Sequence, residues 1–491
     1  MAEQLSPEGL AVTVGEVTIT TPGLTGTVEV YPPASGGMRA AEDASVDFLA
    51  AIEEAGMGEQ LTVEVTGPAE LDDAGGTRAS GGGNEIVVDV PAPGEGNGQV
   101  LLYKAEDGSL TWHLPDDVPT DEVAQRGGSR RTYRLPRQVV APEAAEGGQR
   151  GLLGALGTKV LKVLVFPLVD PVLGAVGKRL SASWESKHRR MLVRPFGPTT
   201  HRTRAVDGVD EAAWSRLAAG PALLFVHGTF VMADSAFSAL GDETMAELDR
   251  RYGGRLFALD HHTVSVSPRD NVEWLASVVP GGVHLTVDVV THSRGGLVGR
   301  ALAERGAELG LDGRLTVRTL VMVAPPNAGT ALADPDHLGA YLDRITNLAQ
   351  FVPGSGLVDA LGLVLTIVKQ LAVGAAKGMP GLMSMNPSGD ELVAFNDTPG
   401  SSATYRVIAA DFEPPPGSGL GRIARDAGTD IVFGSTRNDL VVPTDGWTVP
   451  GATGFPVAEP FVVPASEGVD HSSFFGRDDV RAKLLEWLPG A

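Results

Sequence analysis

HLTVDVVTHSRGGLVG, residues 284 to 299, carries the strongest fold signal in this 491-residue chain. Its first half alternates β-branched and polar side chains, as a strand does, and its second half continues with apolar side chains at helical spacing. Between the two halves, Ser293 is followed by Arg294 and two glycines, which matches a nucleophile elbow, a tight strand-to-helix turn that exposes a serine hydroxyl. We therefore expect Ser293 to be a nucleophile.

Around this stretch, from Pro221 onward, strand-like runs alternate with helix-like runs, which is typical of a parallel sheet with crossover helices. Continuous apolar runs such as ALLFV and TLVMVA are typical of central strands buried on both faces. We predict strands at residues 222–226, 255–259, 285–290, 315–323 and 405–410. We predict helices at residues 235–252, 271–279 (capped by Asp270), 295–306 and 480–488. Between residues 335 and 395 the alternation stops, and this insert is long enough to be a helical cap.

A nucleophilic serine needs a base to take its proton and an acid to orient that base. His471 lies in a polar loop ahead of the last helix and is our candidate base, whereas His292 sits in the elbow turn itself. Asp439, in STRNDLVVP, lies between the elbow serine and His471 in chain order and is our candidate acid. Asp411 and Asp430 are the alternatives.

An oxyanion needs backbone N–H donors, and two positions are suited to supply them. One is the residue after the nucleophile, Arg294. The other is Thr229 in the run LLFVHGTF, where Gly228 lets the chain double back after an early strand. We expect the Thr229 and Arg294 amides to form an oxyanion hole.

Four motifs together carry a family resemblance: FVHGT, VTHSRGG, APPNAGTALAD at residues 324–334, and NDLVVP followed by DHS. They resemble the bacterial triacylglycerol lipases and related esterases of the α/β-hydrolase superfamily, in particular a branch with long N-terminal extensions. The resemblance covers the chain from about residue 221 onward. One position departs from the usual G-x-S-x-G pattern: Thr291 stands where the first glycine is expected, at a close approach of helix and strand.

The resemblance implies an α/β fold, an α/β-hydrolase with a mostly parallel sheet, flanking helices and a helical cap. It implies a triad of Ser293, Asp439 and His471, with Thr229 helping to form the oxyanion hole. It also implies that the insert at residues 335–395 is a lid or cap. The apolar run at residues 357–376 would then either face an acyl pocket or complete the core, and we weigh these two interpretations equally.

The chain before the elbow domain has a different texture. Residues 1–140 show short β-type runs separated by turns, which predicts a smaller β-rich accessory domain. We interpret residues 141–205 as a linker and an amphipathic helical segment, and residues 206–491 as the hydrolase domain. The arginine-rich run at residues 188–204 would serve as a solvated hinge or, less readily, as a site for a phosphate or carboxylate.

The amino-acid composition limits the kinds of partner and ligand that the protein can have. The net charge of −22 argues against nucleic acid, and the absence of cysteine excludes disulfides and thiolate ligands. We predict no cofactor and no metal, because the pair His261 and His262 lacks further ligands at suitable spacing. The first residues lack a secretory signal, so we expect a cytoplasmic protein. The apolar runs at residues 152–177 and 357–376 carry charges or prolines, so we expect no transmembrane segment and leave peripheral membrane contact open.

These observations predict a serine hydrolase that cleaves carboxylic esters of small molecules or lipids. Two alternatives remain open. A catalytically silent hydrolase fold could act as a binding or scaffolding module, with residues 1–140 recruiting a protein partner; Thr291 and the long extension motivate this alternative. An acyltransferase or amidase would use the same triad.

Overall fold

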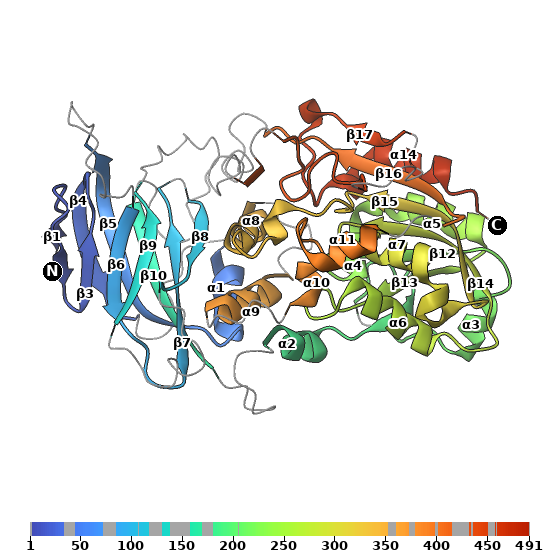
Figure 1. The fold of residues 1–491 in the computed structure, drawn as a ribbon, viewed down its shortest axis with the longest axis horizontal. Coiled ribbons are helices and arrows are strands. Elements are labelled where there is room, and N and C mark those ends of the chain that lie inside the picture. Colours follow the sequence, from blue (N-terminus) through green and yellow to red (C-terminus); the bar gives the residue numbers. More distant parts are fainter. Residues whose placement is uncertain are drawn as a thin grey trace.

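The computed structural model describes most of the chain. The described residues are 2–33, 45–71, 85–106, 108–116, 130–137, 158–168, 180–204, 206–351, 360–372, 379–397, 401–414, 432–433, 436–449, 457 and 459–490. The predicted linker at residues 141–150 and the alternative acid Asp430 lie outside them. Figure 1 shows two β-sheet regions at opposite ends of the molecule with helices between them.

The N-terminal region is a sandwich of two antiparallel sheets. The larger sheet has the order β1 (Glu3–Gln4), β4 (Leu24–Tyr31), β5 (Gly58–Glu70), β10 (Thr158–Pro167), β7 (Asn97–Lys104) and β8 (Leu110–His113). The smaller sheet has the order β2 (Val12–Val14), β3 (Val17–Thr20), β6 (Glu85–Pro91) and β9 (Arg130–Pro136). Alternate side chains such as Val63, Val88 and Leu101 fill the space between the sheets. The predicted β-rich N-terminal region is confirmed.

Strand β10 corrects the interpretation of residues 158–167 as helical. It pairs with β5 and β7 in the middle of the larger sheet. Because both of its faces are buried, its apolar side chains form a nearly continuous run, and periodicity alone does not separate such a strand from a buried helix. Its two lysines are neutralised locally, since Lys159 lies 2.9 Å from Glu106 and Lys162 lies 2.7 Å from Glu59. The domain limits at residues 140 and 205 stay predictions.

The second sheet has seven strands and belongs to the elbow region. Its order is β11 (Leu192–Pro195), β13 (Leu256–Asp260), β12 (Ala222–Val226), β14 (Leu285–His292), β15 (Leu315–Val323), β16 (Thr404–Ala410) and β17 (Phe461–Val463). All neighbours are parallel except the antiparallel edge pair β11 and β13. The strands predicted from Pro221 onward are all present, because long apolar runs bounded by turns leave little ambiguity.

Helices cover both faces of this sheet. Side chains of α3 (Glu211–Leu217), α6 (Pro268–Val278) and α7 (Gly295–Arg305) pack into one apolar core, and those of α5 (Asp242–Tyr252) and α14 (Asp478–Trp487) into another. Two predicted details are wrong. The helix expected at residues 235–252 is divided into α4 (Ala233–Ala236), a 3₁₀ turn and α5, because Gly241 has a φ of 80°. The cap of α6 is Ser267, whose hydroxyl accepts from the Asp270 amide.

The insert between β15 and β16 is helical, as predicted. It contains α8 (Leu338–Phe351), α9 (Leu361–Ala372), α10 (Pro380–Met383) and α11 (Asp390–Asn396), and Figure 1 shows α8 and α9 beside α1 (Ser45–Glu54) and α2 (Leu180–His188) between the two sheet regions. Helix α9 is buried on nearly all sides and shares one apolar core with β7 and α8. For residues 360–372, the described part of this apolar run, the structure supports the interpretation that completes the core, and residues 357–359 and 373–376 lie outside the described residues. No helix among the described residues is both long and apolar enough to span a bilayer.

Candidate active site

Ser293 lies in a strained turn at the end of β14. Its φ of 55° is in the left-handed region, which a residue other than glycine seldom adopts. The turn is held because the Ser293 amide donates to the Val323 carbonyl of the neighbouring strand at 2.8 Å. The serine side chain therefore stands at the carboxyl edge of the sheet, and it lines a pocket there.

Thr291 fits into the elbow because the helix that follows offers room for it. A Cβ atom at Gly299 would lie 2.8 Å from Thr291 Cγ2, so only glycine is accommodated at that helix position without a shift. The Thr291 hydroxyl donates to the Val321 carbonyl at 3.5 Å and is fully buried. The strand side chain is larger than the glycine of the G-x-S-x-G pattern, and the helix residue that faces it is Gly299.

His471 and Asp439 form a buried, direct pair. His471 Nδ1 donates to Asp439 Oδ2 at 2.7 Å, and the His471 amide donates to the Asp439 carbonyl at 2.9 Å. The other carboxylate oxygen of Asp439 accepts from the amides of Val441 and Val442, at 3.0 and 2.7 Å. With its proton on Nδ1, the imidazole ring keeps a lone pair on Nε2.

Ser293, His471 and Thr229 line one pocket. The pocket has a cavity volume of about 30 Å³ and is otherwise walled mainly by apolar side chains, including Phe230 and Ile345. Ser293 Oγ and the His471 ring line the same pocket, and no hydrogen bond joins them within the described residues. Asp439 is the carboxylate that pairs with the candidate base, whereas the other described candidate acid, Asp411, lies 3.9 Å from Arg437.

His227 orients the backbone of the loop after β12. Its Nδ1 donates to the Gly228 carbonyl at 2.9 Å, and its Nε2 accepts from the His261 amide at 3.1 Å. Burial lowers the pKa of His227 to about 3, so the ring is neutral and Nε2 is free to accept. In a trans peptide the carbonyl and the next N–H point in opposite directions, so a Gly228 carbonyl held on the His227 side directs the Thr229 N–H away from that ring.

The two predicted oxyanion donors have no acceptor among the residues that the structure describes. Within the described part of the chain, neither the Thr229 amide nor the Arg294 amide donates a hydrogen bond. The Arg294 side chain is held elsewhere, since its Nε donates to the Gly381 carbonyl at 2.8 Å and its Nη2 to the Val266 carbonyl at 2.5 Å. Buried amides normally have partners, so these two are available to a ligand oxygen.

His292 is a functional candidate that the sequence analysis set aside. Its Nε2 donates to the His471 backbone carbonyl at 2.9 Å, and the two rings lie 5.0 Å apart. Burial lowers the pKa of His292 to about 3, so it holds the loop of the base as a neutral donor. A bond to a backbone carbonyl 179 residues away leaves no spacing signal in the sequence.

Two arginines of the basic run brace the same region. The Arg189 guanidinium donates to the carbonyls of Phe230 and Val231, directly after Thr229, and Phe230 has a φ of 67°. Arg194 Nη1 donates to Asp260 at 3.4 Å. Both arginines are fully buried, so for them neither a solvated hinge nor an open anion site is correct.

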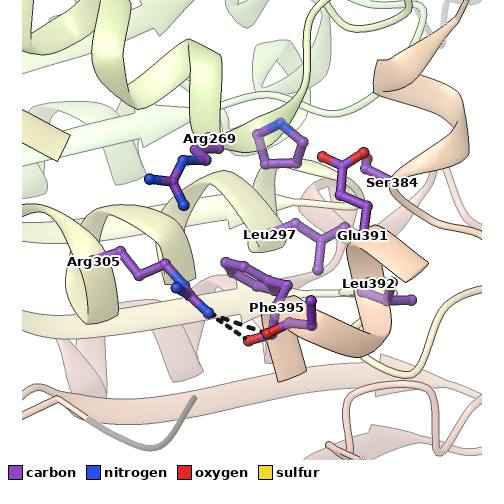
Figure 2. A pocket seen from close by; sticks show the side chains of 9 residues that line it. Arg269, Leu297, Arg305, Ser384, Glu391, Leu392 and Phe395 are labelled. Carbon is purple, nitrogen blue, oxygen red and sulfur yellow. Dashed lines mark hydrogen bonds between the residues drawn. The ribbon is translucent and has the colours of Figure 1, made fainter. Parts of the chain in front are cut away.

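A second pocket lies apart from Ser293, between α7 and α11. Figure 2 shows its lining, with Leu297 and Phe395 as apolar walls and Arg305 beside Phe395. It has a cavity volume of about 220 Å³, and none of the predicted site residues line it. Arg305 Nη2 donates to the Ala394 and Phe395 carbonyls at 3.2 and 3.5 Å. Across the described residues, no three histidine or acidic side chains are grouped so that they could hold a metal ion.

A mostly parallel sheet with helices on both faces, a left-handed serine between β14 and α7, and a helical insert after β15 define an α/β-hydrolase fold. Within that class, the chain belongs to a family described as "Domain of unknown function (DUF7379)", whose model matches residues 188–489.

Similar solved structures are distant. The mature lipase BlEst2 of Bacillus licheniformis is 19% identical, covers 58% of this chain and 96% of its own, and has a TM-score of 0.35. Lipase 1 from Pelosinus fermentans is 17% identical, covers 55% of this chain and 96% of its own, and has a TM-score of 0.37. No curated protein matches the chain. The fold assignment rests on the strand order and the elbow.

Proposed function

We propose that the protein is a serine hydrolase that cleaves carboxylic esters. The observation that carries this proposal is the buried pair of His471 and Asp439, joined at 2.7 Å, on the same pocket as a serine in left-handed conformation. A strained serine and an imidazole oriented by a carboxylate on one pocket are the arrangement that acyl transfer needs.

In the proposed reaction, Ser293 Oγ attacks the carbonyl carbon of the ester and His471 Nε2 takes the hydroxyl proton. Asp439 holds the ring in the Nδ1–H tautomer and stabilises the imidazolium that forms. The amides of Thr229 and Arg294 bind the oxyanion. His471 returns the proton to the departing alcohol, and a water molecule, activated by the same ring, then releases the acid from Ser293.

The pocket wall favours an apolar acyl group. The side chains of Phe230, Val231, Ile345 and Leu348 line it, and they would exclude water from the acyl-enzyme. We therefore propose small-molecule or lipid esters with an apolar acid as substrates.

Purified protein and the Ser293→Ala variant, assayed with p-nitrophenyl esters, test the proposal. Loss of a triad nucleophile costs on the order of 10⁶ in kcat. A Ser293→Ala rate within tenfold of the wild type contradicts the proposal. Labelling by a fluorophosphonate probe is the companion measurement: labelling at Ser293 supports an active serine, and its failure in folded protein favours the catalytically silent binding module.

A further inference from the structure

Helix α8 presents two different faces to two different parts of the molecule. Tyr341, Ile345 and Leu348 follow the spacing of one helical face, and they line the pocket of Ser293. Asp343, Thr346 and Asn347 lie on another face, which contacts strand β8 of the N-terminal sandwich. Figure 1 shows α8 between β8 and the elbow domain.

The polar face of α8 takes the place of a neighbouring strand. Among the described strands, β8 is the edge of its sheet, so one row of its backbone groups has no strand partner there. Asn347 Oδ1 accepts from the Leu110 amide at 3.0 Å, and its Nδ2 donates to the Leu110 carbonyl at 2.7 Å. Asp343 Oδ1 accepts from the Trp112 amide at 2.7 Å. Two side chains thus satisfy three groups of the sheet edge.

These contacts fix the register of α8. Asn347 both accepts from the Leu110 amide and donates to the Leu110 carbonyl, and the Trp112 ring nitrogen donates to Thr346 Oγ1 at 3.0 Å. All of them are buried in the apolar core that joins the cap to the N-terminal sheet. Shifting or turning the helix would leave buried polar groups without partners, which is strongly unfavourable.

Helix α8 also contacts the loop of the proposed acid, Asp439. The fully buried Arg344 donates from Nη1 to the Leu440 carbonyl at 2.6 Å, directly after Asp439. On the pocket face, the Tyr341 ring lies 5.6 Å from the ring of Phe230, next to Thr229. A helix held by β8 therefore touches both the acid loop and the oxyanion loop.

We infer that the N-terminal β-sandwich is a working part of the substrate site, because β8 holds α8 in the register that shapes the acyl pocket. Asp343, Thr346 and Asn347 are positioning residues in this arrangement, and Tyr341, Ile345 and Leu348 determine which apolar acyl chain fits. This inference rests on the proposed function, since it concerns the acyl group bound to Ser293.

The test compares full-length variants on p-nitrophenyl acetate, butyrate and octanoate. Asn347→Ala and Asp343→Ala loosen α8, so we expect the ratio of kcat/KM for octanoate to that for acetate to change about tenfold or more. Asp343→Asn keeps the acceptor for the Trp112 amide, and we expect a ratio close to that of the wild type. Thr346→Val, which keeps the side-chain shape, provides a milder variant if the alanine proteins fail to fold.

Gln370→Ala on α9 is the matched control. It removes a buried bond to a backbone amide, that of Ser181, without touching β8 or the pocket. We expect its selectivity to stay within about twofold of the wild type.

Backbone hydrogen exchange at residues 338–349 and 439–442 adds a readout that needs no substrate. Faster exchange in both segments for Asn347→Ala, and in neither for Gln370→Ala, supports the inference. An active wild-type protein whose β8-contact variants keep its selectivity overturns this inference alone. A wild-type protein that neither hydrolyses esters nor labels with fluorophosphonate overturns the proposed function, and this inference with it.

Discussion

The pocket of Ser293 has two walls that are built in different ways. One, the catalytic wall, consists of Thr229, Phe230, His292, Ser293 and His471 at the ends of strands and in loops of the elbow domain. The other, the cap wall, consists of Tyr341, Ile345 and Leu348 on α8. The catalytic wall is fixed by its own backbone, with positive φ at Phe230 and Ser293 and neutral buried imidazoles on main-chain carbonyls. The cap wall is held by side chains that bind a different domain.

For the proposed ester hydrolysis, this contrast predicts that the two walls control rate and selectivity separately. Groups that meet the reacting atoms must be preorganised, and strained backbone inside a close-packed sheet domain supplies that rigidity. A wall that meets only the acyl chain needs shape, which a helix packed across two domains can supply. Changes to the catalytic wall and its supports should slow all esters alike, whereas changes to the cap wall should alter which ester is preferred.

The largest effect on this comparison is expected from Asp439→Asn, behind the catalytic wall. The amide oxygen can still accept from Val441 and Val442, so the loop stays folded. The amide nitrogen would face His471 Nδ1 and favour the wrong tautomer, which costs about 10⁴ in kcat. Kinetics on acetate and octanoate esters should fall in equal proportion at an unchanged melting temperature. A loss confined to one ester would contradict the division of roles.

The second effect is expected from Gly228→Ala. A Cβ atom at this position would lie 2.6 Å from Ser293 Cβ and 3.0 Å from the His292 carbonyl, so the oxyanion loop must shift. Displacing one oxyanion donor costs about 10² to 10³ in kcat. Gly281→Ala, where a Cβ meets nothing within 4 Å, is the control and should keep full activity. Equal activity in the two variants would show that the loop near Thr229 takes no part in catalysis.

Part of the catalytic wall can be predicted from the sequence, because its signals lie within short stretches of the chain. The strand-to-helix change around Ser293 and the continuous apolar runs of β12 and β15 are strong signals, because period and burial agree along the chain. The order of Ser293, Asp439 and His471 adds a constraint that single residues lack. The pairing of His471 with Asp439 has the geometry that this order suggests, and their catalytic roles stay predictions.

The residues that hold the two walls in place could not be predicted from the sequence. His227 and His292 act through backbone carbonyls, and such bonds carry no residue-type or spacing signature. The most apolar run of the cap drew attention to α9, yet the pocket is lined by α8, a helix with a polar face. The polar side chains of that face find hydrogen-bond partners at the free edge of β8. This contact depends on the tertiary arrangement of two domains.

The third effect is a loss of stability at low pH. Two buried histidines cause it: His292 in the catalytic wall, and His227, which orients the backbone of the oxyanion loop. His227 and His292 have a pKa of about 3 in the folded protein and near 6.5 when unfolded, because burial disfavours the charged ring. Between these values only the unfolded chain binds the protons. The unfolding free energy therefore falls as pH drops below 6.5, by about 1.4 kcal/mol per pH unit for each histidine.

Urea unfolding at about pH 7 and about pH 5.5 measures this loss. Raised pKa values at the buried Asp234 and Asp260 act in the opposite direction, so the informative quantity is a difference between proteins. His227→Asn can keep a donor for the Gly228 carbonyl and removes the titrating ring, and it should reduce the pH dependence by about 1.4 kcal/mol per pH unit. The same dependence in both proteins would contradict a neutral, buried His227.

The smallest effect is expected on the cap wall, from Ile345→Ala. Ile345 is 4% exposed and lines the pocket beside Ser293, so truncation enlarges the acyl site. One or two methylene groups change discrimination by about tenfold. We expect the kcat/KM ratio to shift toward octanoate by about this factor, with the acetate rate within threefold of the wild type. Val368→Ala on α9 removes a fully buried side chain that does not line the pocket, so it should lower stability by about 1 kcal/mol and leave selectivity unchanged. A shift of equal size in both variants would mean that selectivity follows the stability of the cap as a whole and not the face of α8.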